Sequence, residues 1–171
     1  GSTVNTIEKI LKENEQNLNV QIANDNSDGQ IVLSGKTNDI DKLIVILKEN
    51  NIKNIKLPVS APFHCSLMNK ATDIMSNELN KLNFVEGKNR LISNVTANEI
   101  SNTNELKDLL IKQIENRVRW RESVINMIDS GVNHFIEIGP GKVLSGLVKR
   151  ISKEVKIDTI INQGNIEGLK I

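Results

Sequence analysis

The segment PVSAPFH, residues 58–64, divides the chain into two regions whose apolar residues follow different patterns. Two of the three prolines in the chain lie in this segment. Proline lacks the backbone N–H that a helix interior or a central strand requires, so we predict a loop here. The loop would join two units, residues 1–57 and residues 58–171. A chain of 171 residues is long enough for a small domain together with part of another.

The first unit, residues 1–57, is predicted to contain two helices and three strands in the order α-β-β-α-β. Helices are expected at residues 4–14 and 37–50, where apolar residues recur at helical spacing, among them Ile7 with Ile10 and Leu43 with Leu47. Strands are expected at residues 18–23, 31–34 and 52–57, and a polar loop at residues 24–30. A ferredoxin-like split unit has the order β-α-β-β-α-β. We therefore interpret this unit as a ferredoxin-like subdomain without its first strand. Because a sheet opened in that way has an unpaired edge, we expect the sequence to begin inside a domain.

The second unit, residues 58–171, is predicted to be an α/β domain. Helices are expected at residues 66–82, 104–116, 119–131 and 142–151, and strands at residues 90–95, 134–140 and 156–162. The strand at residues 134–140 is mostly apolar, which is typical of a strand buried in a parallel sheet. Strands that alternate with helices in this way indicate a layered α/β architecture.

The composition of the chain excludes several functional classes. Twenty-two basic and 21 acidic residues leave a net charge of +1, which gives no electrostatic footprint for nucleic acid or for an anionic membrane. One Trp, three Phe and no Tyr leave no aromatic platform for stacking RNA bases. No apolar run approaches the roughly 20 residues of a membrane span. The single cysteine, Cys65, cannot form an internal disulfide, which favours a reducing compartment.

Four segments in chain order together resemble the bacterial-type malonyl-CoA:acyl carrier protein transacylases of fatty acid synthesis. They are ANDNS with GQIVLSG (23–35), LPVSAPFHCSLM (57–68), QIEN with VRW (113–120) and IEIGPGKVL with GLVKRI (136–151). The chain departs from the family at Asp28 and Arg117, where proline is usual. The resemblance implies that residues 58–171 are the C-terminal part of an α/β-hydrolase-like acyltransferase domain.

This resemblance implies a two-step acyl transfer through a serine ester. His64 matches the histidine that removes the serine proton, which is needed because a hydroxyl is a poor nucleophile at neutral pH. Gln113 matches the residue whose backbone carbonyl orients that histidine, and such a carbonyl can fix the imidazole tautomer. The family's serine lies in a G-H-S-x-G elbow, and no G-x-S-x-G occurs in this sequence. We therefore expect the missing N-terminal half of the enzyme to carry the serine, and the chain alone to be inactive.

Three residues are candidates for substrate binding by resemblance. Phe63 precedes the histidine, as in family members that prefer malonyl, although a Phe that fills the core would look the same. Asn24 and Asn26 match a loop that overhangs the cleft, although Asn also tolerates turn conformations. The implied partners are malonyl-CoA, acyl carrier protein and the complementary half. No cofactor is implied, since malonyl-CoA and phosphopantetheine are substrates.

Several other interpretations stay open or are disfavoured. Cys65 beside His64 could suggest a Cys-His dyad, but adjacent residues usually point apart and no third orienting group is evident. GPGK at residues 139–142 is better explained as a turn and helix start than as a phosphate cradle, because it is shorter than a P-loop. His134 is predicted to be structural, and two His with one Cys far apart cannot form a zinc site.

Alternative functions are the acyltransferase domain of a polyketide synthase and a non-enzymatic ferredoxin-like binding module. The second alternative rests on the α-β-β-α-β order alone, whereas all of residues 58–171 speak against it. We expect a cytoplasmic location, or the plastid stroma if the source is an A/T-rich eukaryote with plastids. No nucleic-acid or membrane partner is expected.

Overall fold

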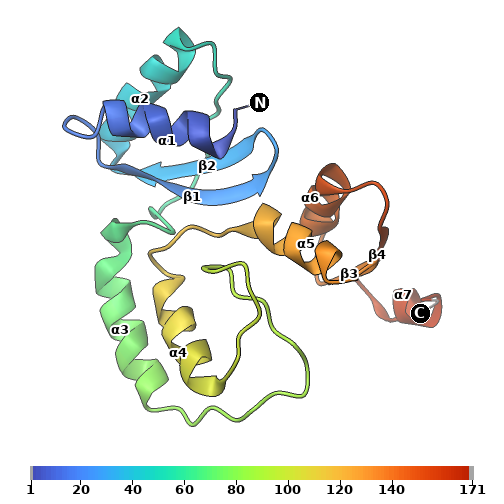
Figure 1. Ribbon diagram of the computed structural model, residues 1–171. Coiled ribbons are helices and arrows are strands. Elements are labelled where there is room, and N and C mark those ends of the chain that lie inside the picture. Colours follow the sequence, from blue (N-terminus) through green and yellow to red (C-terminus); the bar gives the residue numbers. More distant parts are fainter. Residues whose placement is uncertain (1, 170–171) are drawn as a thin grey trace.

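The computed structural model describes residues 2–169, and its helices and strands form two groups joined by the segment before η1 (Figure 1). The elements are α1 (Val4–Glu13), β1 (Val20–Ser27), β2 (Gln30–Gly35), α2 (Thr37–Glu49), η1 (Ser66–Met68), α3 (Asn69–Asn80), α4 (Thr103–Lys112), α5 (Trp120–Asp129), β3 (His134–Ile138), α6 (Val143–Ile151), β4 (Lys156–Ile160) and α7 (Gln163–Glu167). All six predicted helices are confirmed with shifted ends, and α7 was not predicted. The boundary placed after residue 57 stays a prediction.

The first group is an antiparallel hairpin, β1 with β2, packed against α1 and α2. Its core repeats at helical spacing on α1 (Ile7 and Ile10) and on α2 (Leu43 and Leu47), because residues three or four apart share a helix face. Thr3 caps α1 by accepting a hydrogen bond from the N–H of Thr6 through its side-chain oxygen. The helices therefore bury the apolar stripes from which they were predicted.

Two predictions for this group are wrong. The expected loop at residues 24–30 is mostly strand, since β1 runs to Ser27 and β2 begins at Gln30. Polar Asp25 and Ser27 point into the protein and are each 1% exposed, so composition alone suggested a loop where a strand exists. Residues 52–57, all of which the structure describes, form no strand, and Ile55 among them is 88% exposed. The observed order is therefore α-β-β-α, and the ferredoxin-like description is not confirmed.

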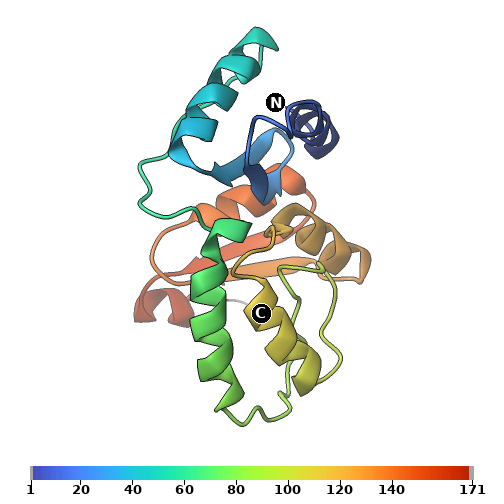
Figure 2. The ribbon, with the colours of Figure 1, turned by 90° about the vertical axis from the view of Figure 1, so that its left-hand side faces the viewer.

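The second group contains a parallel pair of strands, β3 and β4, connected through α6. Register partners run from His134 with Lys156 to Ile138 with Ile160. Parallel strands need such a crossover connection, so the β-α-β order predicted here is confirmed. The strand expected at residues 90–95 is wrong, because that segment contributes only an isolated bridge from Ile92 to Glu99. Helices α3 and α4 lie side by side below the hairpin group (Figure 2).

A short stretch of backbone joins the two groups. The N–H of Asp25 donates to the carbonyl of Val118 (2.9 Å), and the N–H of Val118 donates to the carbonyl of Ala23 (2.8 Å). Val118 thus forms a parallel bridge to Asn24, on the edge of β1 that does not pair with β2. The segment that leads from α4 into α5 is therefore fixed to the hairpin strand.

Candidate active site

His64 lies in a tight turn that the backbone adopts only with strain. Its φ angle is +59°, in the left-handed region that few non-glycine residues occupy. Cys65 stabilises the turn through two hydrogen bonds. Its thiol donates to the carbonyl of Pro62 (3.1 Å), and its carbonyl accepts from the N–H of Met68 (3.0 Å). Residues in such conformations persist only when their surroundings fix them, and they cluster at functional sites.

The imidazole of His64 contacts the main chain at the end of α4. Its Nδ1 lies 2.8 Å from the carbonyl oxygen of Gln113. Gln113 is the C-terminal cap of α4, and the last carbonyls of a helix have no partner within it, so this oxygen is available. A carbonyl can only accept a hydrogen bond, so in the neutral imidazole Nδ1 carries the proton and Nε2 is the unprotonated nitrogen. Nε2 is therefore the ring atom that can act as a base.

Gln113 is itself held by Asn94, which we did not single out from the sequence. The side-chain amide of Asn94 donates to Oε1 of Gln113 (3.3 Å), and the carbonyl of Asn94 accepts from the N–H of Arg119 (2.9 Å). Asn94 lies in the segment that we predicted to be a strand, and nothing in the local pattern marks it as functional. It anchors the Gln113 side chain while the Gln113 carbonyl faces His64.

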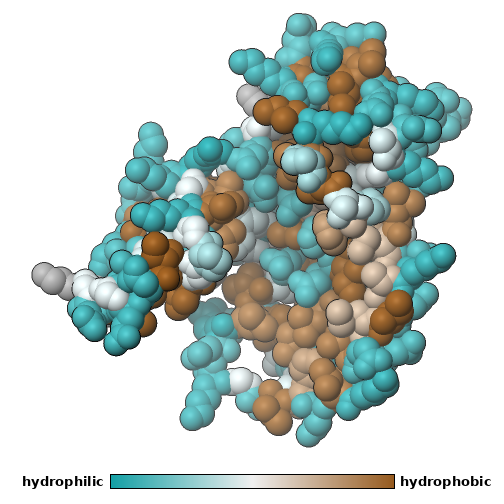
Figure 3. Space-filling model, turned by 180° about the vertical axis from the view of Figure 1, so that it is seen from behind, coloured by the Kyte–Doolittle hydropathy of each residue, from teal (hydrophilic) through white to brown (hydrophobic). Residues whose placement is uncertain are grey.

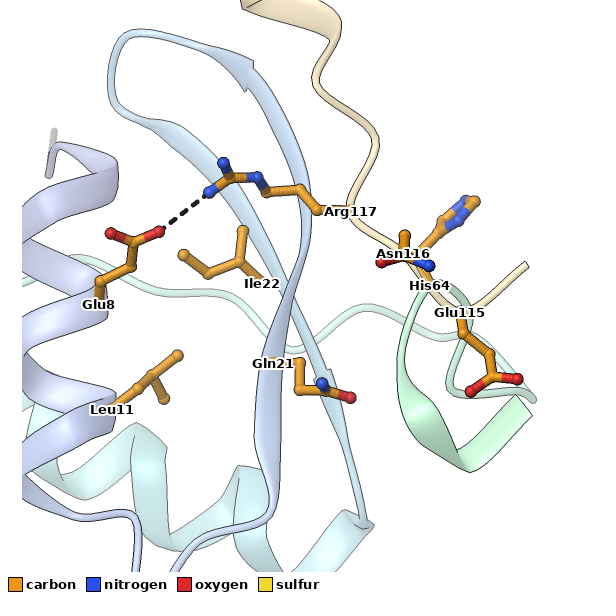
Figure 4. A pocket seen from close by; sticks show the side chains of 8 residues that line it. All are labelled: Glu8, Leu11, Gln21, Ile22, His64, Glu115, Asn116 and Arg117. Atoms are coloured by element: carbon orange, nitrogen blue, oxygen red, sulfur yellow. Dashed lines mark hydrogen bonds and ion pairs between the residues drawn. The ribbon is translucent and has the colours of Figure 1, made fainter. Parts of the chain in front are cut away.

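An open pocket of about 350 Å³ lies beside His64 (Figure 4). Its lining comes from α1, β1, the His64 turn and the segment after α4, namely Glu8, Leu11, Gln21, Ile22, His64, Glu115, Asn116 and Arg117. Arg117 reaches across to Glu8, with 3.1 Å between Nη1 and Oε1, and lies 3.7 Å from Glu122. The pocket therefore has a charged wall on the α1 side and the imidazole at its other side.

The structure places the other candidate residues in several different environments. Phe63 is 53% exposed, so it does not fill the core. Asn24 and Asn26 lie within β1 and not on a loop, which corrects that part of the prediction; Asn24 is the residue bridged to Val118. His134 lies at the start of β3 with Nε2 2.7 Å from Oδ2 of Asp158, outside the residues that line the His64 pocket.

The two alternative chemistries considered for this chain do not fit the geometry. The thiol of Cys65 is 1% exposed and donates to a carbonyl, so it is not presented as a nucleophile beside His64. The start of α6 after the GPGK segment is occupied by the carboxylate of Glu137, which accepts from the N–H groups of Leu144 (3.1 Å) and Ser145 (2.7 Å). These contacts lower the pKa of Glu137, chiefly through the Ser145 hydroxyl and N–H. A helix start already filled by a carboxylate is a cap and not a phosphate cradle.

Residues 2–169 include neither a membrane-spanning helix nor a metal-binding cluster. None of the helices there is long and apolar enough to cross a membrane. Within the same residues, no group of three or more His, Cys, Asp or Glu side chains is arranged to hold a metal ion.

Comparison with known proteins assigns the architecture around His64 to a family. The acyl transferase domain family matches residues 3–165. This chain belongs to the acyl transferase domain family. The match covers both groups of secondary structure and includes His64, Asn94 and Gln113.

Similar acyl transferases have names that agree with one another. A protein of Bacillus subtilis (strain 168), named malonyl CoA-acyl carrier protein transacylase, is 40% identical over 157 residues, which are 91% of this chain and 50% of the relative. A protein of the same name from Staphylococcus aureus (strain MSSA476) is 39% identical over 150 residues, 87% of this chain and 49% of the relative. The chain thus spans about half the length of the curated relatives it matches.

Solved acyl transferase structures superpose on almost the whole chain. Malonyl CoA-acyl carrier protein transacylase from Clostridium perfringens has a TM-score of 0.93 at 37% identity, covering 98% of this chain and 53% of that one. A chain from the complex of a type II polyketide synthase acyl-carrier protein with its malonyl-transacylase has a TM-score of 0.91 at 30% identity. The match covers 98% of this chain and 54% of that one. The α/β architecture described above is therefore that of roughly half of a malonyl-transacylase.

Proposed function

We propose that this chain supplies the base of a transacylase that moves malonyl from coenzyme A to the phosphopantetheine thiol of an acyl carrier protein. The observation that carries the proposal is the 2.8 Å contact of His64 Nδ1 with the Gln113 carbonyl, which leaves Nε2 as the proton acceptor. The Bacillus subtilis and Staphylococcus aureus relatives are both named malonyl CoA-acyl carrier protein transacylase, which supports malonyl as the acyl group. No dissociable cofactor takes part in the proposed reaction.

In the proposed mechanism, the nucleophile is a serine outside these 171 residues, because no G-x-S-x-G occurs among them. Nε2 of His64 removes the serine proton as the oxygen attacks the malonyl thioester, and the same proton then leaves with the thiolate of coenzyme A. In the second step, Nε2 takes the proton of the phosphopantetheine thiol, whose sulfur attacks the ester. The proton is returned to the serine oxygen as the thioester of the carrier protein forms.

A backbone carbonyl as the orienting group has a chemical consequence in this mechanism. The Gln113 carbonyl fixes the tautomer and the ring direction, but it carries no formal charge to balance the imidazolium that forms. The transition state therefore draws less electrostatic stabilisation from this contact than a carboxylate partner would give. Asn94 stiffens the contact by holding the Gln113 side chain.

The partner in this proposal is a complementary polypeptide that carries the serine. Parallel sheets are normally covered on both faces, yet Ile138 at the end of β3 is 77% exposed and Val143 at the start of α6 is 72% exposed. Apolar side chains also gather on the side of α3 and α4 (Figure 3), where Ile74 is 66% exposed. Exposed apolar surface on this scale indicates an interface. The match covers 50% of the Bacillus subtilis relative, so the other half of such a protein is long enough to be this partner.

The finer assignments belong to the same proposal. Phe63 would contact the acyl group, and Asn24 and Asn26 would bond the pantetheine arm from β1. We retain a ferredoxin-like subdomain as the description of residues 1–57 once the complementary half adds its strands. Type II fatty acid synthesis in the bacterial cytoplasm is the proposed setting. The match to a type II polyketide malonyl-transacylase favours polyketide synthesis as the second candidate.

A chimera tests the proposed function. This chain would replace the matched half of the Bacillus subtilis relative, and malonyl transfer from malonyl-CoA to an acyl carrier protein would be followed by mass spectrometry of the carrier. We expect turnover by the chimera and its loss with His64→Ala. A folded chimera that transfers at the same rate with and without His64 would refute the proposal.

A further inference from the structure

The N–H of Ser66, two residues after His64, has an unusual hydrogen-bond partner. It donates to Oε1 of Gln21 over 2.6 Å, a contact between residues 45 positions apart. Ser66 is the first residue of η1, and the first N–H groups of a helix lack partners within it. The residue before it, Cys65, makes no side-chain cap and directs its thiol to Pro62. Gln21 therefore caps this helix start from a distant strand.

Gln21 belongs to β1, which also holds the segment that follows Gln113. Ala23 and Asp25, two and four residues further along β1, exchange backbone hydrogen bonds with Val118. One strand thus contacts both halves of the His64–Gln113 pair, since residue 21 binds the histidine turn and residues 23 and 25 bind the carbonyl segment. Residues two apart on a strand are about 7 Å apart, so β1 sets a fixed spacing between the two contacts.

We propose that Gln21 is a positioning residue for His64. Its carboxamide accepts from the N–H of Ser66 and so fixes the left-handed turn in the position that brings Nδ1 of His64 to the Gln113 carbonyl. The turn has a cost because His64 has φ +59°, and an external contact is needed to keep it in place. Gln21 is an exposed residue that lines the pocket beside His64, so this role is distinct from filling the core. The inference deepens the proposed function, but its test does not require acyl transfer.

The test measures the tautomer of His64 in the chain by ¹⁵N NMR of the imidazole nitrogens. The chain has two histidines, so His134 serves as an internal control and His134→Ala assigns the signals. At alkaline pH, where imidazole is neutral, the unchanged chain should show a protonated Nδ1 and an unprotonated Nε2 for His64. Gln21→Met replaces the carboxamide with an apolar side chain of similar size and so removes the acceptor. It should lower the ratio of the Nδ1-protonated to the Nε2-protonated tautomer of His64 by about 3- to 10-fold, the value of one net hydrogen bond.

Two matched variants sharpen the test. Gln21→Glu keeps an acceptor at the helix start and should restore the tautomer. Ser66→Pro removes the donor at a first-turn position that tolerates proline, after a Cys65 whose extended φ and ψ of −146° and 168° suit a residue before proline. It should reproduce Gln21→Met, and combining the two should add nothing further. Gln16→Met, at an exposed turn after α1, should leave the spectrum unchanged.

The outcomes separate this inference from the proposed function. A folded Gln21→Met protein with an unchanged His64 tautomer overturns the positioning role, and if that variant does not fold, Ser66→Pro decides in the same way. An inactive chimera together with a shifted tautomer would refute the proposed function and leave the positioning role intact. An active chimera together with an unshifted tautomer in Gln21→Met would refute the positioning role and support the proposed function.

Discussion

Arg121 on α5 donates to both carboxylate oxygens of Asp25 on β1, with Nε 3.1 Å from each oxygen and Nη2 3.0 Å from Oδ2. Asp25 is 1% exposed, so this pair connects the two groups of secondary structure through a buried charge. The hydrogen bond to Asp25 raises the pKa of Arg121 above its ordinary value. Asp28 adds a longer contact of 3.8 Å to the same guanidinium.

Removing the cation from this pair should destabilise the chain strongly. Arg121→Met leaves a buried carboxylate without its partner, and we expect a loss of about 3 kcal/mol in the free energy of unfolding. Adding Asp25→Asn to that variant should recover part of the loss, because the uncompensated charge is then gone. Urea denaturation of the two variants measures both effects.

The control for this prediction is an exposed pair on α1. Lys9 and Glu13 are 78% and 59% exposed at 3.9 Å, and Lys9→Met should change the free energy of unfolding by less than about 0.5 kcal/mol. Equal losses for Lys9→Met and Arg121→Met would contradict the importance we give to the buried pair.

His64→Ala should slow malonyl transfer in the chimera by about 10²-fold or more, the scale expected when a general base is lost. Gln113→Ala should be much milder, because the contact uses its backbone carbonyl and only the Asn94 hydrogen bond disappears. His134→Ala should affect stability alone. Steady-state kcat/KM for the three variants tests the ranking, and a greater loss for Gln113→Ala than for His64→Ala would show the roles to be misassigned.

Glu137 should make the stability of the chain depend on acidic pH. Its pKa is lowered from 4.5 in the folded protein by hydrogen bonds from the Ser145 side chain and the start of α6. The contribution of ionised Glu137 to the free energy of unfolding is therefore present above about pH 4.5, and it is lost as the pH falls through the folded pKa of Glu137. The difference in unfolding free energy between the unchanged chain and Glu137→Gln should be largest near pH 7 and should shrink at pH 3. A difference independent of pH would argue against this cap.

The 171-residue chain alone should not become acylated by malonyl-CoA. It has no serine elbow, and the thiol of Cys65 is buried and donates to Pro62. Intact-mass measurement after incubation with malonyl-CoA checks this expectation. If stoichiometric acylation occurs, Cys65→Ser identifies whether the thiol carries the acyl group.

Phe63→Ser should separate a structural role from a role in selectivity. Because Phe63 is 53% exposed, the substitution should change the free energy of unfolding by less than about 1 kcal/mol. In the chimera, the preference for malonyl over a branched extender should decrease. Competition between malonyl-CoA and methylmalonyl-CoA measures the ratio, and an unchanged ratio would remove Phe63 from the acyl-binding site.

The sequence by itself determined the helices of this protein and the pairing of His64 with Gln113. The stripe of Ile7 and Ile10 and that of Leu43 and Leu47 predicted α1 and α2, because burial of one helix face depends only on residues close in the chain. The His64 and Gln113 motifs predicted their contact through resemblance, and the structure has it at 2.8 Å.

Only the tertiary structure decided which polar residues are buried and what they contact. Asp25 and Ser27 suggested a loop, yet they continue β1 in its pairing with β2. The buried carboxylate of Asp25 is matched by Arg121, and its N–H donates to Val118, both more than 90 residues away in the chain. The alternating run at residues 52–57 suggested a strand, yet this run pairs with no strand among the described residues. Strand pairing and polar burial depend on what lies opposite, and distant segments bring those partners, as Gln21 is brought to Ser66.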